Sequence, residues 1–178
     1  MNLSPRSCSS YWPIREQAGT DLMRIEYINP IIESAVSVLA EFTGAAVERG
    51  DMKLHGNSSA SKEVAAIIGM TGDVDGRIII EMDNGTALAL AGLMNHEQFK
   101  TLDRLALDSL MELSNVVVAR AVSSLNDQGF SFRLTPPLIF TGANLSFFSS
   151  LSLETLIIPL RTKAGDCNLN VSLRMNVL

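Results

Sequence analysis

Several residue types are scarce in this sequence of 178 residues. Cysteine occurs only twice, at Cys8 and Cys167, so the spacing indicates neither a disulfide framework nor a cysteine-rich metal site. Histidine also occurs twice, and His55 and His96 stand far apart among polar residues, which favours surface positions over ligand or catalytic roles. Aromatic residues make up only 6% of the chain, so aliphatic side chains must fill most of the core.

Long apolar runs are missing as well. No stretch approaches the roughly 20 apolar residues that a membrane-spanning helix requires, and the first 22 residues lack the apolar segment of a secretory signal. Lys and Arg number 14 against 19 Asp and Glu, and the resulting net charge of −5 argues against a nucleic-acid surface. These absences predict a soluble, cytoplasmic protein that binds neither membranes nor nucleic acid.

The length and the composition fit one globular domain. A hydrophobic fraction of 47% and a charged fraction of 19% are ordinary for a folded protein. The first 22 residues contain Ser, Pro and Arg without a clear period. We interpret residues 1–22 as a disordered leader, an added segment, or upstream sequence from an early start codon. The domain is then expected to span residues 23–178.

The first half of this domain has the pattern of a helix followed by three strands. Apolar residues recur at helical spacing over residues 29–46, with Asn29 and Pro30 as the expected N-cap and first turn and Gly44 near the end. Asp75-Gly76 between two apolar runs predicts a hairpin turn. The expected strands cover residues 47–56, 63–72 and 76–83, with a Ser- and Gly-rich loop at 55–62 and a short helix at 85–94.

The second half repeats the plan. A long helix is expected from Leu102 to Leu125, followed by strands at residues 132–142, 154–165 and 167–176. Gly165-Asp166 is the expected second hairpin turn, and Pro136-Pro137 indicates a sheet edge or a bulge. Two such halves predict an α/β domain of the α+β type with pseudo-two-fold symmetry, in which long helices cover one face of a mainly antiparallel sheet.

The second long helix carries the residues with the clearest chemical potential. Asp108, Glu112, Asn115 and Ala119 follow one another at spacings of four, three and four, so they share one face of the helix. Glu112 and Asn115 then project side by side, and Ala119 leaves room for a partner to approach. The opposite face is the predicted core stripe: Leu107, Leu110, Met111, Ser114, Val117, Val118, Ala121 and Leu125. An ordinary solvated helix face would give the same spacing, so both interpretations stay open on spacing alone.

The segments around this helix resemble the CheX/CheC/FliY family of chemotaxis phosphatases. That family has an Asp or Ser, three residues, then Glu-x-x-Asn, with a Pro some twenty residues later. This chain has Asp108, Glu112 and Asn115, with Pro136 and Pro137 at about that distance. The stretches YINPIIESAVSVLAEFTG and RLTPPLIFTG also look like the family's. The first half has Glu33 but Val36 where the second half has Asn115. Within this family, a chain with one such motif, in the second long helix, resembles CheX.

The resemblance implies a phosphatase that hydrolyses the aspartyl phosphate of a CheY-like response regulator. It implies that Asn115 positions the attacking water, that Glu112 anchors the regulator's active-site lysine, and that Asp108 lies at the rim. It also implies Mg²⁺ bound by the regulator rather than by this chain, and a homodimer. A non-catalytic adaptor that docks a receiver domain or a flagellar-switch component through the same helix face is the alternative. A regulator outside motility is a further possible partner.

The sequence does not contain the usual motifs of a pocket enzyme. There is no glycine-rich phosphate loop, no Ser-His-Asp or Cys-His arrangement, and no metal-ligand spacing. If the chain catalyses a reaction, the partner is therefore expected to complete the active site.

Overall fold

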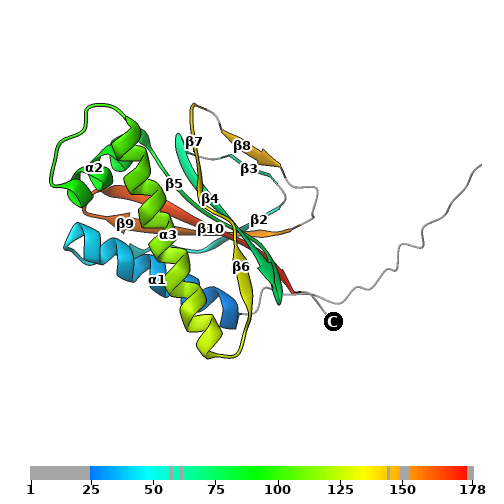
Figure 1. Cartoon of the computed structure of the whole chain (residues 1–178). Coiled ribbons are helices and arrows are strands. Elements are labelled where there is room, and N and C mark those ends of the chain that lie inside the picture. Colours follow the sequence, from blue (N-terminus) through cyan, green and yellow to red (C-terminus); the bar gives the residue numbers. More distant parts are fainter. Residues whose placement is uncertain (1–24, 57, 61, 144, 149–152, 176–178) are drawn as a thin grey trace, which may run out of the picture.

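An antiparallel sheet carries helices on one face in the computed structural model (Figure 1). The structure describes residues 25–56, 58–60, 62–143, 145–148 and 153–175, so the predicted leader at 1–22 lies outside the described residues. The helices are α1 (Ile25–Thr43), α2 (Asn84–Asn95) and α3 (Arg104–Asp127). None of these three helices is long and apolar enough to span a membrane.

The first helix starts earlier than the sequence indicates. α1 begins at Ile25, so Asn29 is not its N-cap and Pro30 lies inside the helix. Tyr27 and Ile28 are 5% and 4% exposed, and their burial draws the preceding turn onto the core. Pro30 is the sixth residue of α1, so its missing N–H removes one intrahelical hydrogen bond, the one to the Glu26 carbonyl. The predicted end is confirmed: α1 stops at Thr43, and Gly44 follows with φ +63°.

The sheet confirms the predicted duplication. Its strand order is β1-β9-β10-β5-β4-β6, with β2 also beside β9 and β7 also beside β4. The central pair therefore joins the last strand of each half, and the first strands of each half pair with the hairpin of the other half. A pseudo-two-fold axis follows from this palindromic order. The strands are β1 (Glu48–Arg49), β2 (Lys53–His55), β3 (Ser58–Ala60), β4 (Val64–Gly72), β5 (Val74–Met82), β6 (Phe132–Leu134), β7 (Leu138–Thr141), β8 (Ser146–Phe148), β9 (Thr155–Thr162) and β10 (Gly165–Met175).

Both edges of the sheet carry a bulge, which splits each predicted edge strand into two. On one edge, Thr135 and the two prolines face only Ile68 and Gly69 of β4. On the other edge, residues 50–52 face only residues 158–159 of β9. One extra residue on the outer strand is the definition of a β-bulge. The predicted edge position of Pro136-Pro137 is confirmed, since a missing N–H is tolerated there.

The turn predictions were partly wrong. Asp75 and Gly76 lie inside β5, and the hairpin turns at Asp73 instead. Gly165-Asp166 begins β10, and the turn is Lys163-Ala164. A Cβ on Gly76 would collide with the Ser172 carbonyl of β10, so the glycine allows β5 and β10 to lie close together. Gly165 has φ +135°, a backbone angle that favours glycine, and it packs closely against Thr86 of α2.

The predicted loop at 55–62 contains a strand. β3 pairs with β8 in a separate two-stranded antiparallel sheet. This pairing joins segments that are far apart in the sequence, which local residue patterns do not reveal. Residues 57 and 61, on either side of β3, lie outside the described residues.

The hydrophobic core lies between the helices and the sheet face that they cover. α1 and α3 pack against each other, α2 packs against α3, and all three contact the sheet or its hairpin. Fully buried large side chains of this core come from both layers: Ile31, Ile32, Leu39, Met70, Ile78, Met82, Leu90, Leu110, Leu113, Leu125 and Ile158. The core thereby fixes the position and the rotation of α3.

Cys167 is expected to be chemically inert in the folded protein. It has no exposed surface, and burial raises the pKa of its thiol from 9.0 to about 12. Because the thiolate is the reacting species, a Cys8→Ser variant should show almost no reaction with Ellman's reagent at pH 8. One thiol should react after unfolding in urea. Rapid reaction of the native variant would contradict the burial of Cys167.

Candidate functional site

The helix that carries the candidate residues is fixed firmly at its start. Asp103 is its N-cap, and the Asp103 side chain accepts a hydrogen bond of 3.0 Å from the Ala106 N–H. One turn later, the Asn95 side chain at the end of α2 donates to Ser109 Oγ at 2.7 Å. The Ser109 hydroxyl in turn donates to the Leu105 carbonyl at 2.8 Å. The first two turns of α3 are therefore tied both to their own cap and to the neighbouring helix.

The predicted polar stripe lies on the outer face of α3. Asp108, Glu112, Asn115 and Ala119 are all exposed, as the periodicity indicates. The predicted core stripe needs correction, because Leu107 and Met111 are only half-buried, whereas Leu113 has no exposed surface. The buried arc is broader than the predicted stripe because α3 contacts α1, α2 and the sheet at once. Its buried residues are Ala106, Ser109, Leu110, Leu113, Ser114, Val117, Val118, Ala121, Val122 and Leu125.

Glu112 and Asn115 form the chemically useful pair of this stripe. Residues three apart on a helix are neighbours, about 5–6 Å apart at Cβ. Neither side chain makes a hydrogen bond or an ion pair with another described residue. The Glu112 carboxylate is therefore available to a cation, and the Asn115 carboxamide is available as both donor and acceptor. The pair can hold a polar group or a water presented by a partner surface.

The other two predicted residues flank this pair. Asp108 is joined to Arg104, one turn earlier, by an ion pair of 3.4 Å between the Arg104 Nε and an Asp108 carboxylate oxygen. Both side chains are largely exposed, so this pair contributes little to stability. Ala119 lies one turn beyond Asn115, and its small side chain leaves space on the helix surface.

Arg120 is a residue of this surface that the sequence did not reveal. Its guanidinium donates to Glu41 Oε2 at 3.0 Å and to Ser37 Oγ at 3.1 Å, both on α1. These contacts join α3 to α1. An exposed cation on one helix and an exposed anion on another become partners only once the packing of the two helices is known.

The first half of the chain offers only part of such a pair. Glu33 on α1 is exposed in the same way as Glu112, but Val36 is half-buried and apolar where α3 has Asn115. Since an apolar side chain cannot hold a water by hydrogen bonds, only α3 carries the complete pair.

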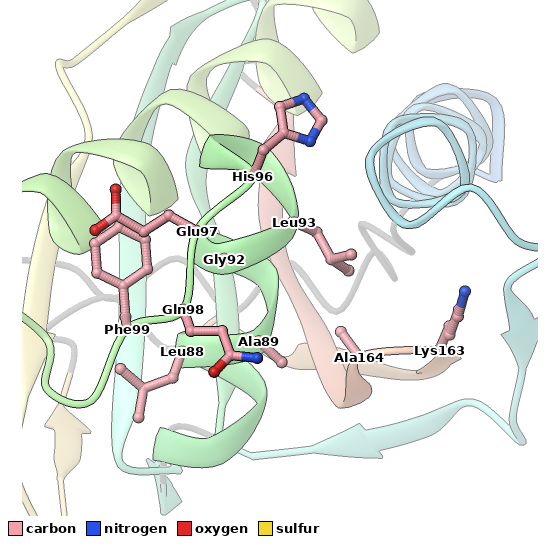
Figure 2. Close-up of a pocket in the computed structure, with 10 residues that line it drawn as sticks. All are labelled: Leu88, Ala89, Gly92, Leu93, His96, Glu97, Gln98, Phe99, Lys163 and Ala164. Atoms are coloured by element: carbon pink, nitrogen blue, oxygen red, sulfur yellow. The ribbon is translucent and has the colours of Figure 1, made fainter.

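A separate hollow of about 630 Å³ lies between the end of α2 and the β9–β10 turn (Figure 2). In Figure 2, the α2 side chains and the residues after them stand on one side, and Lys163 and Ala164 stand opposite. None of the four predicted site residues lines this hollow. The candidate site on α3 is an open surface.

The described residues include no group of three or more His, Cys, Asp or Glu side chains that could hold a metal ion. Asp83, an acidic residue outside the stripe, caps α2 instead: its side chain accepts from the Thr86 N–H at 2.7 Å, and this hydrogen bond lowers the pKa of the carboxyl.

Comparison with known proteins identifies the family of this chain. The family model described as chemotaxis phosphatase CheX matches residues 64–161, more than half of the chain. The chain belongs to the chemotaxis phosphatase CheX family. It is accordingly an enzyme of the phosphatase class, and the resemblance noted in the sequence is confirmed.

Individual relatives support the same assignment. The CheY-P phosphatase CheX of Thermotoga maritima is 25% identical over 128 residues, which cover 71% of this chain and 83% of that protein. The crystal structure of the CheX–CheY–BeF₃–Mg²⁺ complex from Borrelia burgdorferi matches with 32% identity and a TM-score of 0.73, over 85% of this chain and 99% of that one. The chemotaxis protein CheX of Vibrio vulnificus shares the fold, with a TM-score of 0.75 at 23% identity, over 84% of this chain and 99% of that one.

Proposed function

We propose that this CheX-family chain hydrolyses the aspartyl phosphate of a phosphorylated CheY-type response regulator in chemotaxis signalling. The observation that carries the proposal is the exposure of Glu112 and Asn115 side by side on α3, without hydrogen-bond partners among the described residues. The similar Borrelia burgdorferi protein, which forms a complex with CheY, BeF₃ and Mg²⁺, supports a receiver domain as the partner.

The proposed mechanism suits the chemistry of the substrate. An acyl phosphate is already reactive, so a catalyst has mainly to place a water in line with phosphorus and to exclude other geometries. The water oxygen bonds to phosphorus, the bond from phosphorus to the aspartyl oxygen breaks, and inorganic phosphate leaves the regenerated carboxylate. Mg²⁺ on the regulator would neutralise charge on the phosphoryl oxygens.

Asn115 is the residue that we assign to the water. Its carboxamide can accept one hydrogen bond from the water and donate another, while carrying no charge that would repel the phosphoryl group. Its neighbour Glu112 does carry a negative charge, so we assign Glu112 to the active-site lysine of the regulator. Asp108 and Ala119 would then line the rim of the docked partner.

Glu112→Gln should therefore raise KM for the phosphorylated regulator roughly tenfold, because docking desolvates the charge pair and so strengthens it. The expected change in kcat is less than threefold. Steady-state rates of phosphate release over a range of regulator concentrations separate the two constants.

Glu33→Gln is the matched control, since Glu33 is an exposed glutamate at the corresponding position of α1. It should leave both constants unchanged. A Glu112→Gln variant with unchanged KM and a strongly reduced kcat would assign Glu112 to proton transfer instead of anchoring.

We also propose that the protein works as a homodimer in the cytoplasm, as the family resemblance implies. Analytical ultracentrifugation of the full chain tests the first point, and a single monomeric species at micromolar concentration would exclude it.

A further inference from the structure

The outer face of α3 contains an apolar residue that extends the stripe of Glu112 and Asn115. Leu105 lies three residues before Asp108, so the spacing from Leu105 to Ala119 is three, four, three and four. The Leu105 side chain is 48% exposed, although it belongs to a helix whose opposite face is fully packed. Leu105, Glu112 and Asn115 therefore point in a common direction.

Leu105 differs in its place from the other exposed apolar side chains. Single exposed leucines are normal on protein surfaces and by themselves indicate nothing. Leu105 is the one on α3; Leu93 belongs to α2, and the others lie on or next to the edge strands β2 and β7. Six large apolar side chains are exposed among the described residues: Met52, Leu54, Leu93, Leu105, Leu138 and Phe140.

We propose that Leu105 is an apolar anchor by which this surface binds its regulator, packed against apolar side chains of the regulator about 15 Å from its phosphorylation site. The inference rests on the proposed function, because it uses the docking face that Glu112 and Asn115 define. It adds a determinant of affinity that is separate from the two polar residues.

The dimensions of a protein interface are compatible with this assignment. Leu105 lies ten residues before Asn115, which is about 15 Å along a helix. An interface of standard size buries about 800 Å² on each partner, which corresponds to a disc of roughly 16 Å radius. A disc of this radius centred on Asn115 reaches Leu105 near its edge. Leu105 is therefore within reach of a regulator whose phosphoryl group meets Asn115.

The backbone at Leu105 is held firmly in place. Its carbonyl accepts from Ser109, which in turn accepts from Asn95 of α2, and the N-cap Asp103 closes the same turn. Because this helix turn is already ordered, its backbone loses little conformational entropy on binding. The Arg104–Asp108 ion pair lies next to it. An apolar contact at this end of the interface would help to exclude water from the polar pair further along the helix.

The test measures Kd for a beryllofluoride-activated CheY-type regulator of the same cell, and KM and kcat for its phosphorylated form. Leu105→Ala should raise Kd and KM about fivefold, and Leu105→Gln, which keeps the length but is polar, about tenfold. Leu105→Met should stay within twofold of wild type, because it is apolar and helix-compatible. The kcat value should not change in any of the three.

Leu54→Ala is the matched control, because Leu54 is 57% exposed but lies on the edge strand β2. It should leave Kd and KM unchanged. Wild-type Kd for both Leu105→Ala and Leu105→Gln would overturn the proposal. If wild type binds the regulator without hydrolysing its phosphate, the proposed function fails, and the Kd series still decides the role of Leu105.

Discussion

Replacement of Asn115 with alanine is expected to reduce the stimulated rate of phosphate loss about 100-fold or more. The proposed contact is made to the attacking water, so its loss should lower kcat while KM stays within about threefold of wild type. The fold should survive, because Asn115 is exposed and alanine is the better helix former. Circular dichroism melts and phosphate-release kinetics on the same samples measure both effects.

Asn126→Ala is the control for this prediction. Asn126 is exposed on the same helix, and its side chain makes no hydrogen bond with another described residue. It lies eleven residues beyond Asn115, about 16 Å along the axis, so a water held at Asn115 is out of its reach. Its kinetics should match wild type. An Asn115→Ala variant with a normal kcat would contradict the assignment of the water to Asn115.

Replacement of Gly76 with alanine is expected to destabilise the fold strongly. Gly76 lies in the central strand β5, where an added Cβ would overlap the Ser172 carbonyl and approach the Leu173 Cα to 2.9 Å. Either the β5–β10 ladder separates locally or the backbone is strained. Overpacking of this kind costs about 3 kcal/mol, a large part of the 5–15 kcal/mol that is typical of a domain. Urea denaturation measures the change.

Gly56→Ala provides the comparison, since no atom lies within 4 Å of a Cβ at Gly56. It should change the free energy of unfolding by less than about 0.5 kcal/mol. Equal stability of the two variants would show that β5 and β10 do not approach as closely as described.

The same glycine shows where prediction from sequence stops. Asp75-Gly76 has the composition of a hairpin turn, and the hairpin itself is real, but it turns at Asp73. What Gly76 accommodates is β10, almost a hundred residues later in the chain, and no local pattern records that contact. The pairing of β3 with β8 and the bridge from Arg120 to Glu41 were missed for the same reason.

Features with a regular local period were predicted well. The exposed stripe of α3 follows from spacing alone, because a helix places residues three and four apart on one face. The duplicated order of helix and strands also predicted the pseudo-two-fold sheet, since equivalent halves form equivalent pairs. The start of α1 was misjudged because the burial of Tyr27 and Ile28, a tertiary effect, outweighs the preference of proline for a first turn.

The most direct test of the proposed function is the rate at which a phosphorylated CheY-type regulator of the same cell loses phosphate, with and without the wild-type chain. The proposed mechanism predicts a rate that rises with the concentration of the chain and saturates as the regulator becomes fully bound. A well-folded chain that binds the phosphorylated regulator and leaves its rate of phosphate loss unchanged would contradict it.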